Sequence, residues 1–274
     1  MGVTRPAVSL IIPAYNEAGR IRSGLAAIAQ YAAAARLSLE TIVVDDGSTD
    51  DTVRVAEAYF RLAPHVSGRV IRLKENKGKG HAVRTGLTAA RAPYAVFSDA
   101  DLSTPIEELP RLLDTLDSGK ADIAFGSRAV DRTLIGVRQS RMRELAGRAF
   151  NLVLRMATGL PFKDTQCGFK AFRMSVCRPL VEAGTIDGFG FDIELLYEAH
   201  RAGLRIREIP VRWNHCDGSK VNMLRDGLRM LRDIYTVRLR GVGGSYDRAI
   251  QLSGVLARRD AMSRVETADT RATA

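Results

Sequence analysis

Short apolar runs alternate with longer amphipathic segments through the first half of the chain. A continuous apolar run predicts a strand buried on both faces, and apolar residues at every third or fourth position predict a helix packed by one side. Their alternation predicts an α/β fold with a doubly wound, mostly parallel sheet and helices on both faces. We expect Asn16 to cap the first helix. The strands are expected at 8–12, 41–44, 70–73, 94–97 and 121–125, with helices between them ending near 35, 62 and 90.

The pattern changes after Arg128. A long basic helix is expected at 134–156, and a basic amphipathic C-terminal helix at 221–239 has Leu224, Leu228, Leu231 and Tyr235 on one side. We expect one domain over 1–240 and a flexible tail over 241–274, because that end is rich in glycine and then in small polar residues. A further helix and a short strand are expected at 191–202 and 205–211.

The composition narrows the class of protein. The chain has 274 residues, of which 46% are hydrophobic, and this is enough for one large domain. A net charge of +10 suits nucleic acid, anionic lipid or phosphorylated substrates, but an aromatic content of 6% argues against a nucleic-acid partner. Every apolar run is much shorter than the ~20 residues of a membrane-spanning helix. Cys167, Cys177 and Cys216 show no metal-ligand spacing and suit a reducing compartment, so we expect a cytoplasmic protein.

Polar clusters follow the predicted strands, at the edge where doubly wound sheets bind ligands. Asp99 and Asp101 stand two apart on an extended segment, so both carboxylates point the same way and can hold Mg²⁺ or Mn²⁺ together with substrate phosphates. Asp45 can accept a hydrogen bond from a nucleobase or a ribose, and Lys79 is a candidate for the phosphates of a nucleotide sugar. The glycine spacing fits neither a dinucleotide fold nor an ATPase loop.

Eight segments together resemble glycosyltransferase family 2, and within it the polyprenyl-phosphate (dolichyl-phosphate) sugar synthases, especially the glucosyl branch. The resemblance covers roughly residues 6–240. It implies a GT-A-type fold and an inverting enzyme that moves a sugar from a nucleotide diphosphate to a lipid-linked phosphate. The segments are V-S-L-I-I-P-A-Y-N-E at 8–17, V-V-D-D-G-S-T-D at 43–50, N-K-G-K-G at 76–80, D-A-D at 99–101, G-S-R at 126–128, D-T-Q-C-G-F-K at 164–170, F-G-F-D-I-E-L-L at 189–196 and D-G-S-K at 217–220.

The same resemblance implies roles for single residues. The D-A-D segment would contact the nucleotide sugar, with its two aspartates on the metal. Arg128 would lie near phosphate, Asp164 matches the family's base, and Arg143 matches an arginine that meets the acceptor phosphate. Residues implied to contact the nucleotide sugar are Pro13, Tyr15, Glu17, Asp45, Asp99, Ala100, Asp101, Arg128, Ser219 and Lys220, the last two in a loop that closes over the donor.

Three positions depart from the mannosyl relatives. Ser103 replaces a glutamine and Asn214 an arginine, and both changes favour a UDP-sugar over GDP-mannose. Gly147 replaces a serine one turn after Arg143.

A phosphate monoester has a second pKa of ~6, so a lipid phosphate needs little help from a base. We therefore expect Asp164 to orient Arg143, Lys163 or the acceptor itself; Asp192 is the next candidate for the base.

The acceptor leaves alternatives open. The leading interpretation is polyprenyl or dolichyl phosphate, met by a protein lying on the cytoplasmic face of the membrane through the basic helices at 134–156 and 221–239. The same fold with a soluble acceptor, and mannosyl transfer from GDP-mannose, are the alternatives. A nucleic-acid or anionic-lipid binding protein would explain the charge but not the clustered acids.

Overall fold

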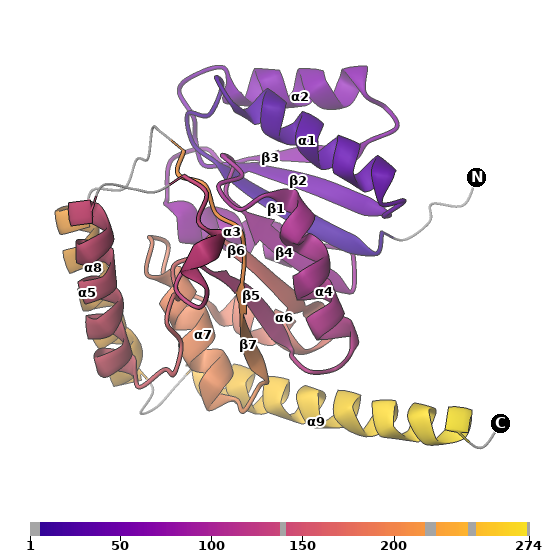
Figure 1. Ribbon diagram of the computed structural model, residues 1–274, viewed down its shortest axis with the longest axis vertical. Helices are drawn as coiled ribbons and strands as arrows, with labels where there is room; N and C mark the ends of the chain where they lie inside the picture. Colours follow the sequence, from indigo (N-terminus) through magenta and orange to yellow (C-terminus); the bar gives the residue numbers. More distant parts are fainter. Residues whose placement is uncertain (1–5, 138–140, 217–222, 241–244, 273–274) are drawn as a thin grey trace.

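A single seven-stranded sheet forms the centre of the computed structural model, which describes residues 6–137, 141–216, 223–240 and 245–272 (Figure 1). Its strand order is β3-β2-β1-β4-β6-β5-β7, and β6 alone among these runs antiparallel to its neighbours β4 and β5. The predicted mostly parallel α/β fold is confirmed. The strands are β1 (Val8–Ala14), β2 (Leu39–Asp45), β3 (Ser67–Arg72), β4 (Tyr94–Ser98), β5 (Ile123–Ser127), β6 (Phe169–Arg173) and β7 (Ile206–Pro210).

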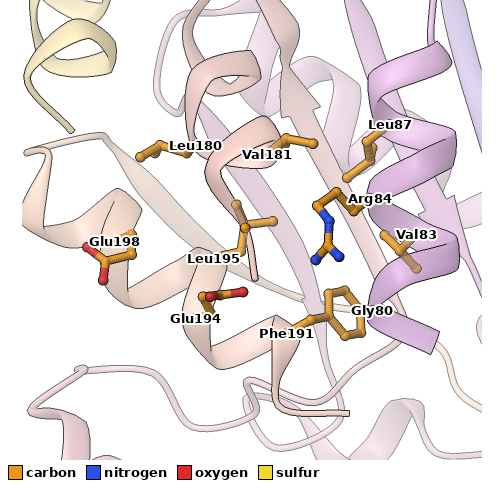
Figure 2. A pocket seen from close by; sticks show the side chains of 11 residues that line it. Gly80, Val83, Arg84, Leu87, Leu180, Val181, Phe191, Glu194, Leu195 and Glu198 are labelled. Carbon is orange, nitrogen blue, oxygen red and sulfur yellow. The ribbon is translucent and has the colours of Figure 1, made fainter. Parts of the chain in front are cut away.

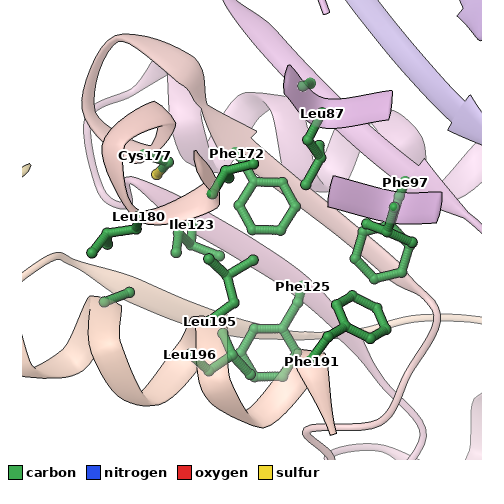
Figure 3. Close-up of a cluster of buried hydrophobic side chains, with 14 of the residues drawn as sticks. Leu87, Phe97, Ile123, Phe125, Phe172, Cys177, Leu180, Phe191, Leu195 and Leu196 are labelled. Carbon is green, nitrogen blue, oxygen red and sulfur yellow. The ribbon is translucent and has the colours of Figure 1, made fainter. Parts of the chain in front are cut away.

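Helices cover both faces of the sheet. One apolar cluster joins it to α1, α2 and α4, and the other joins it to α3, α6, α7 and α9. Figure 3 shows part of the second cluster, where phenylalanines of the central strands meet leucines of α6 and α7. The helices are α1 (Ile21–Ala34), α2 (Thr52–Leu62), α3 (Lys79–Ala89), α4 (Leu109–Asp117), α5 (Arg141–Thr158), α6 (Met174–Ala183), α7 (Phe191–Arg201), α8 (Met223–Arg240) and α9 (Ser245–Ala272).

Strand β1 shows why the predicted strands are uninterrupted apolar runs. Neighbouring side chains of a strand point to opposite faces of the sheet. Leu10 and Ile12 therefore enter the cluster with α1 and α4, while Ile11 enters the cluster with α3. All three are fully buried, and this is possible only because helices cover both faces.

Several expectations differ from the structure, and the long basic helix expected at 134–156 begins only at Arg141, as α5. Asn16 does not cap α1, which begins only at Ile21; its backbone is left-handed (φ 53°), and its side-chain oxygen accepts from the backbone N–H of Thr49 at 2.8 Å. The segment before residue 174 contains the unpredicted strand β6, and α6 follows it. Instead of the flexible tail expected from 241, helix α9 packs on α6 and α7, so the helix expected to be C-terminal, α8, is followed by another.

Helices α5 and α8 lie side by side at one end of the molecule, outside the two layers that cover the sheet (Figure 1). Leu154 of α5 packs with Met230 and Ile234 of α8. The apolar side predicted for α8 is therefore not its core side, because Leu228 and Tyr235 are 70% and 66% exposed. Leu224 lies outside the residues whose side chains are described. In the described chain, each helix is too short or too polar to cross a bilayer.

Candidate functional site

The carboxyl end of β2 presents a buried aspartate to the rim of the sheet. Asp45 is the last residue of that strand and is fully buried. Its Oδ2 accepts a hydrogen bond from the backbone N–H of Ser48 at 3.1 Å, whereas its Oδ1 has no hydrogen-bond partner in the described structure. An unpaired buried carboxylate oxygen is costly, so this atom is suited to accept a hydrogen bond from a bound ligand.

The loop after β1 is locked onto the loop after β2. Pro13 lies inside β1, paired in register with Val44, and places Tyr15 and Glu17 just beyond the strand end. The backbone N–H of Glu17 donates to the hydroxyl of Thr52 at 2.7 Å. Strands β1 and β2 therefore bring the predicted residues 13, 15, 17 and 45 to one edge.

The D-A-D segment follows β4 at the same edge. The Asp99 carboxylate forms an ion pair with Lys79 Nζ at 2.5 Å and sits directly over Gly168, where a Cβ atom would lie only 2.0 Å from Asp99 Oδ2. Asp101 Oδ1 accepts a hydrogen bond from the backbone N–H of Ser103 at 2.9 Å, and Ala100 is buried between the two aspartates. Glycine at 168 is thus required for the position of the Asp99 carboxylate.

Two carboxylates fit a divalent cation that takes its other ligands from substrate phosphates. Asp99 is partly exposed and Asp101 half-buried at the rim, so both are open to a metal–diphosphate complex. Within the described residues, no group of three or more His, Cys, Asp or Glu side chains forms a complete metal site by itself.

Lys79 reaches the rim because the loop before it is held by the carboxylate of Asp46. Gly78 has φ 114°, a backbone conformation that favours glycine, and its N–H donates to Asp46 Oδ2 at 2.8 Å. Burial disfavours the ammonium charge of Lys79, but Asp99 and Asp192 outweigh it and raise the pKa of Lys79. The lysine is therefore a permanent cation beside the D-A-D segment.

Asp164, the predicted base, is paired with Arg128. Burial alone would raise the pKa of Asp164, but the charge and hydrogen bonds of Arg128 lower it below its ordinary value. Arg128 remains protonated, since the nearby carboxylates of Asp164 and Asp99 raise its pKa despite burial. In the described structure the partner of Asp164 is Arg128, which the sequence did not predict for this role, while the side chain of Arg143 lies outside the described residues.

Asp192, the second candidate for the base, is also committed to a cation. Its carboxylate forms an ion pair at 2.6 Å with Lys170 of β6, whose side chain is fully buried. The Lys170 ammonium donates to the backbone oxygen of Cys167 at 2.6 Å and lies 5.2 Å from the ring centre of Phe97. Burial raises the pKa of Asp192, although Lys170 and Lys79 act in the opposite direction. Lys170 is the last residue of the D-T-Q-C-G-F-K segment, but the sequence does not predict that it pairs with Asp192.

A basic cavity of about 320 Å³ adjoins the rim, between α5 and the ends of β5 and β7. Asp164 and Arg128 form its inner wall, and the guanidinium of Arg128 lies over Trp213 at 5.5 Å from the ring centre. The cavity was missed at the sequence level because its walls come from four separate segments. Its lining residues are Arg128, Ala129, Arg132, Ile135, Glu144, Gly147, Arg148, Asn151, Leu152, Arg155, Lys163, Asp164 and Trp213.

A second pocket, shown in Figure 2, lies between α3, α6 and α7. Its volume of about 20 Å³ has room for little more than one water molecule. Glu194 at its edge already accepts hydrogen bonds from the backbone N–H groups of Thr185 and Ile186. This pocket is too small for a sugar nucleotide.

Ser103 and Asn214, two of the positions that depart from the mannosyl pattern, are in direct contact. The backbone N–H of Asn214 donates to the Ser103 carbonyl at 2.8 Å, and the side-chain oxygen of Asn214 accepts from the backbone N–H of Val137 at 3.2 Å. Gly147, the third departure, lines the basic cavity. Ser219 and Lys220 lie outside the described residues, as does the side chain of Arg143, whose backbone belongs to α5.

Comparison with curated proteins gives relatives that match most of this chain and about three quarters of their own length. The dolichyl-phosphate beta-glucosyltransferase of Dictyostelium discoideum is 33% identical over 243 residues, which are 85% of this chain and 74% of the relative. The dolichyl-phosphate beta-glucosyltransferase of Drosophila melanogaster is 36% identical over 253 residues, 87% of this chain and 76% of the relative.

Solved structures with the same fold include glucosyl-3-phosphoglycerate synthase from Mycobacterium tuberculosis. Its complex with uridine diphosphate has a TM-score of 0.62 and 25% identity, over 88% of this chain and 82% of that one. Another of its complexes, with Mn²⁺, uridine diphosphate and glucosyl-3-phosphoglycerate, has a TM-score of 0.62 and 24% identity at the same coverage. The family model of glycosyl transferase family 2 matches residues 9–180. With this match, and with relatives above 30% identity over most of both chains, the chain belongs to glycosyltransferase family 2.

Proposed function

We propose that this glycosyltransferase transfers glucose, or another hexose, from its UDP-linked form to polyprenyl phosphate with inversion of the anomeric centre. The observation that carries the proposal is the juxtaposition of an acidic rim with a basic cavity, joined by Arg128. The Asp99 charge acts on Arg128 from the rim, while Arg128 itself lines the cavity. The curated relatives named dolichyl-phosphate beta-glucosyltransferase support glucose as the sugar and a dolichyl-type phosphate as the acceptor.

The donor would lie across the ends of β1, β2 and β4. The unpaired Oδ1 of Asp45 is suited to accept a hydrogen bond from the uracil or the ribose, with residues 13, 15 and 17 beside it. Lys79 and Arg128 would face the diphosphate, where fixed cations stabilise the charge of the leaving group. Ser219 and Lys220 are proposed to contact the donor, as the resemblance to the family implies.

Asp99 and Asp101 would hold Mg²⁺ or Mn²⁺ on the diphosphate. A divalent cation there neutralises the charge that develops on the departing UDP. The partly exposed carboxylate of Asp99 and the Lys79 ammonium beside it give the rim the mixed charge that such a complex needs.

The acceptor oxygen needs alignment more than deprotonation. Near pH 7 a phosphate monoester with a second pKa of ~6 is largely dianionic and already nucleophilic. Asp164 would therefore act through Arg128, which it holds by hydrogen bonds from Nε and Nη2 at 2.7 Å each. Arg143 is proposed as a further contact of the acceptor phosphate.

The proposed place of the enzyme is the cytoplasmic surface of the membrane. Helices α5 and α8 expose apolar side chains, among them Met142, Met156 and Leu228, and α8 also exposes Arg229 and Arg232. Apolar side chains beside cations favour binding to an anionic membrane surface. Flotation with vesicles that contain anionic lipid at low salt would support this placement, and failure to float would exclude it.

A soluble phosphorylated acceptor is the second candidate. The observation that favours it is the shared fold with glucosyl-3-phosphoglycerate synthase. The discriminating experiment offers radiolabelled UDP-glucose, UDP-N-acetylglucosamine and GDP-mannose to polyprenyl phosphate or to 3-phosphoglycerate, with Mn²⁺, Mg²⁺ or EDTA. Metal-dependent label in an organic-soluble product would support the proposal. Label only in 3-phosphoglycerate would overturn it in favour of the soluble acceptor, and label from GDP-mannose alone would overturn the choice of donor.

A further inference from the structure

Three cations of the basic cavity lack a carboxylate partner within the described part of the chain. Arg128 is neutralised by Asp164, and Arg132 forms an ion pair with Glu144. Side chains of the cavity that have no such partner there are those of Arg148, Arg155 and Lys163. Like charges gathered around one space repel each other unless an anion lies between them. The cavity therefore has an excess of positive charge that suits a ligand with about two negative charges, such as a phosphate monoester.

The size and the walls of the cavity also fit such a headgroup. A volume of about 320 Å³ is at the lower end of the range for small-molecule pockets. Ile135, Leu152 and Trp213 form apolar parts of its wall. Asn151 also lines the cavity and carries a side-chain NH2 group, which is a hydrogen-bond donor for phosphate oxygens. The cavity thus offers both charge and apolar contact, the two properties of a lipid phosphate.

Helix α5 has three distinct faces around its axis. At about 100° per residue, Phe150 and Leu154 form the side packed on α8 and α7. The next side lines the cavity with Gly147, Asn151 and Arg155. The remaining side is an exposed apolar stripe within an arc of about 100°. The stripe, named here the α5 stripe, consists of Met142 (84% exposed), Leu145 (67%), Leu152 (53%), Val153 (40%) and Met156 (69%).

Leu152 belongs to both the cavity wall and the α5 stripe. A ligand can therefore place its phosphate in the cavity while its hydrocarbon chain passes out of the cavity over Leu152 and continues along exposed apolar side chains. A phosphorylated sugar acid or inorganic phosphate has no hydrocarbon chain that could contact the stripe. The continuity of cavity and stripe selects a lipid among the possible phosphate monoesters.

We propose that Arg148, Arg155 and Lys163 bind the phosphate of the polyprenyl acceptor, an inference that rests on the proposed function. The first isoprene units of the acceptor then pack on Leu152 and continue along the α5 stripe. The three cations hold the phosphate at the cavity, and Arg128 lies between it and the rim. These residues are predicted to set the affinity for the acceptor and not the affinity for the donor.

The single tryptophan of the sequence provides a direct binding signal, because Trp213 lines the cavity. Farnesyl phosphate, added without donor or metal, is expected to change the fluorescence of Trp213 in a saturable way. Farnesol and 3-phosphoglycerate should bind far more weakly, by a factor of about ten or more, since each lacks one of the two contacts. Equal binding of 3-phosphoglycerate and farnesyl phosphate would overturn the role of the stripe.

The variants separate the phosphate contacts from the overall charge. Arg148→Ala/Arg155→Ala should weaken farnesyl phosphate binding by about tenfold or more for each lost contact. The matched control Arg61→Ala/Arg259→Ala removes two exposed arginines on α2 and α9 and should bind like the unmodified protein. Leu145→Ser/Met156→Ser should weaken farnesyl phosphate binding but leave inorganic phosphate binding unchanged. Wild-type affinity in the Arg148/Arg155 variant would overturn the proposal.

Steady-state kinetics distinguish this inference from the proposed function. The KM for polyprenyl phosphate should rise about 100-fold in the Arg148/Arg155 variant and about tenfold in Lys163→Ala, while the KM for UDP-glucose stays within about twofold in both. If transfer to lipid proceeds with an unchanged acceptor KM, the inference fails and the proposed function stands. If farnesyl phosphate binds at Trp213 but no sugar is transferred to lipid, the proposed function fails and the binding site stands.

Discussion

Asp164 accepts three hydrogen bonds from Arg128, from Nε at 2.7 Å, from Nη2 at 2.7 Å and from the backbone N–H at 3.0 Å. Such a two-pronged contact fixes both the distance and the plane of the guanidinium. The carboxylate is almost completely buried, so its lone pairs are directed at Arg128 rather than at the cavity. Asp164 thus positions a cation between the acidic rim and the basic cavity.

Asp164→Asn should lower kcat without moving the pH profile of the remaining activity between pH 6 and 8. An amide keeps part of the contact with Arg128 but loses the charge that holds it. A variant that acted by loss of a base would instead show a rate that rises with pH. The pH–rate profile for polyprenyl phosphate decides between these roles, with Arg128→Lys as the partner variant expected to show the same defect.

The stability of the pair should depend on pH with a definite sign. The folded pKa of Asp164 lies below its ordinary value of ~3.9, because Arg128 outweighs the effect of burial. Its stabilising contribution is therefore present above pH ~4 and is lost as the pH falls through the folded pKa. Urea denaturation should show a larger destabilisation by Asp164→Asn at pH 7, up to about 3 kcal/mol, than at pH 3. An equal difference at both values would contradict this.

Gly168→Ala should impair metal binding with little effect on the fold. The added methyl group would lie 2.0 Å from Asp99 Oδ2, so the carboxylate would have to leave its place at the rim. We expect the Mn²⁺ concentration for half-maximal activity to rise about 10–100-fold. Gly188→Ala is the matched control, because its Cβ would meet no atom within 4 Å. Similar metal titrations for both variants would refute the argument.

Lys79→Met should strengthen Mn²⁺ binding in the absence of nucleotide and weaken UDP binding. In the structure Lys79 Nζ lies 2.5 Å from Asp99 Oδ1, so the ammonium would compete with a metal ion for this carboxylate. For a partly exposed ion pair the gain in metal affinity is up to about fivefold. Isothermal titration with Mn²⁺ and then UDP measures both changes, and Lys77→Met, on an exposed side chain of the same loop, serves as the control.

Lys170→Met should destabilise the protein strongly, by about 3–5 kcal/mol, because it leaves the buried carboxylate of Asp192 without its ion-pair partner. The double variant Lys170→Met/Asp192→Leu removes both charges and should be more stable than Lys170→Met alone. Chemical denaturation of the two single variants and the double variant measures the coupling. Additive losses would show that the two side chains do not depend on each other.

The sequence predicts the parallel strands well because each is a dense apolar run covered by helices. It does not reveal β6, whose five residues include Lys170 and Arg173, both buried. Those charges are tolerated because partners from distant elements reach them, Asp192 from α7 in the first case and Asp122 in the second. The residues near a charged side chain in the sequence do not show which distant residue will form its ion pair in the folded protein.

The rim of the site is predictable and the cavity beside it is not. Asp45 ends a strand, Asp99 follows one and Lys79 begins a helix, and a parallel sheet brings such positions together by its topology. The cavity depends on how α5 is rotated about its axis, because this rotation decides that Arg155 lines the cavity and that Met156 lies on the exposed apolar side. The role of Asn16 is unpredictable for a similar reason, because its side-chain oxygen accepts a hydrogen bond from the backbone N–H of Thr49 in the neighbouring loop.

The antiparallel direction of β6 separates the residues of the rim from most residues of the basic cavity along the chain. Strands β1 to β4, which carry the rim residues, come from one continuous stretch that ends before residue 100, and most of the basic cavity comes from a later stretch between β5 and β6. Because β6 runs backwards, that later stretch leaves the sheet edge at β5 and returns to the same edge. It can therefore change in length and sequence without altering the register of the donor strands. An exchange of residues 129–163 between relatives would change the acceptor that the enzyme uses and leave its sugar-nucleotide donor the same.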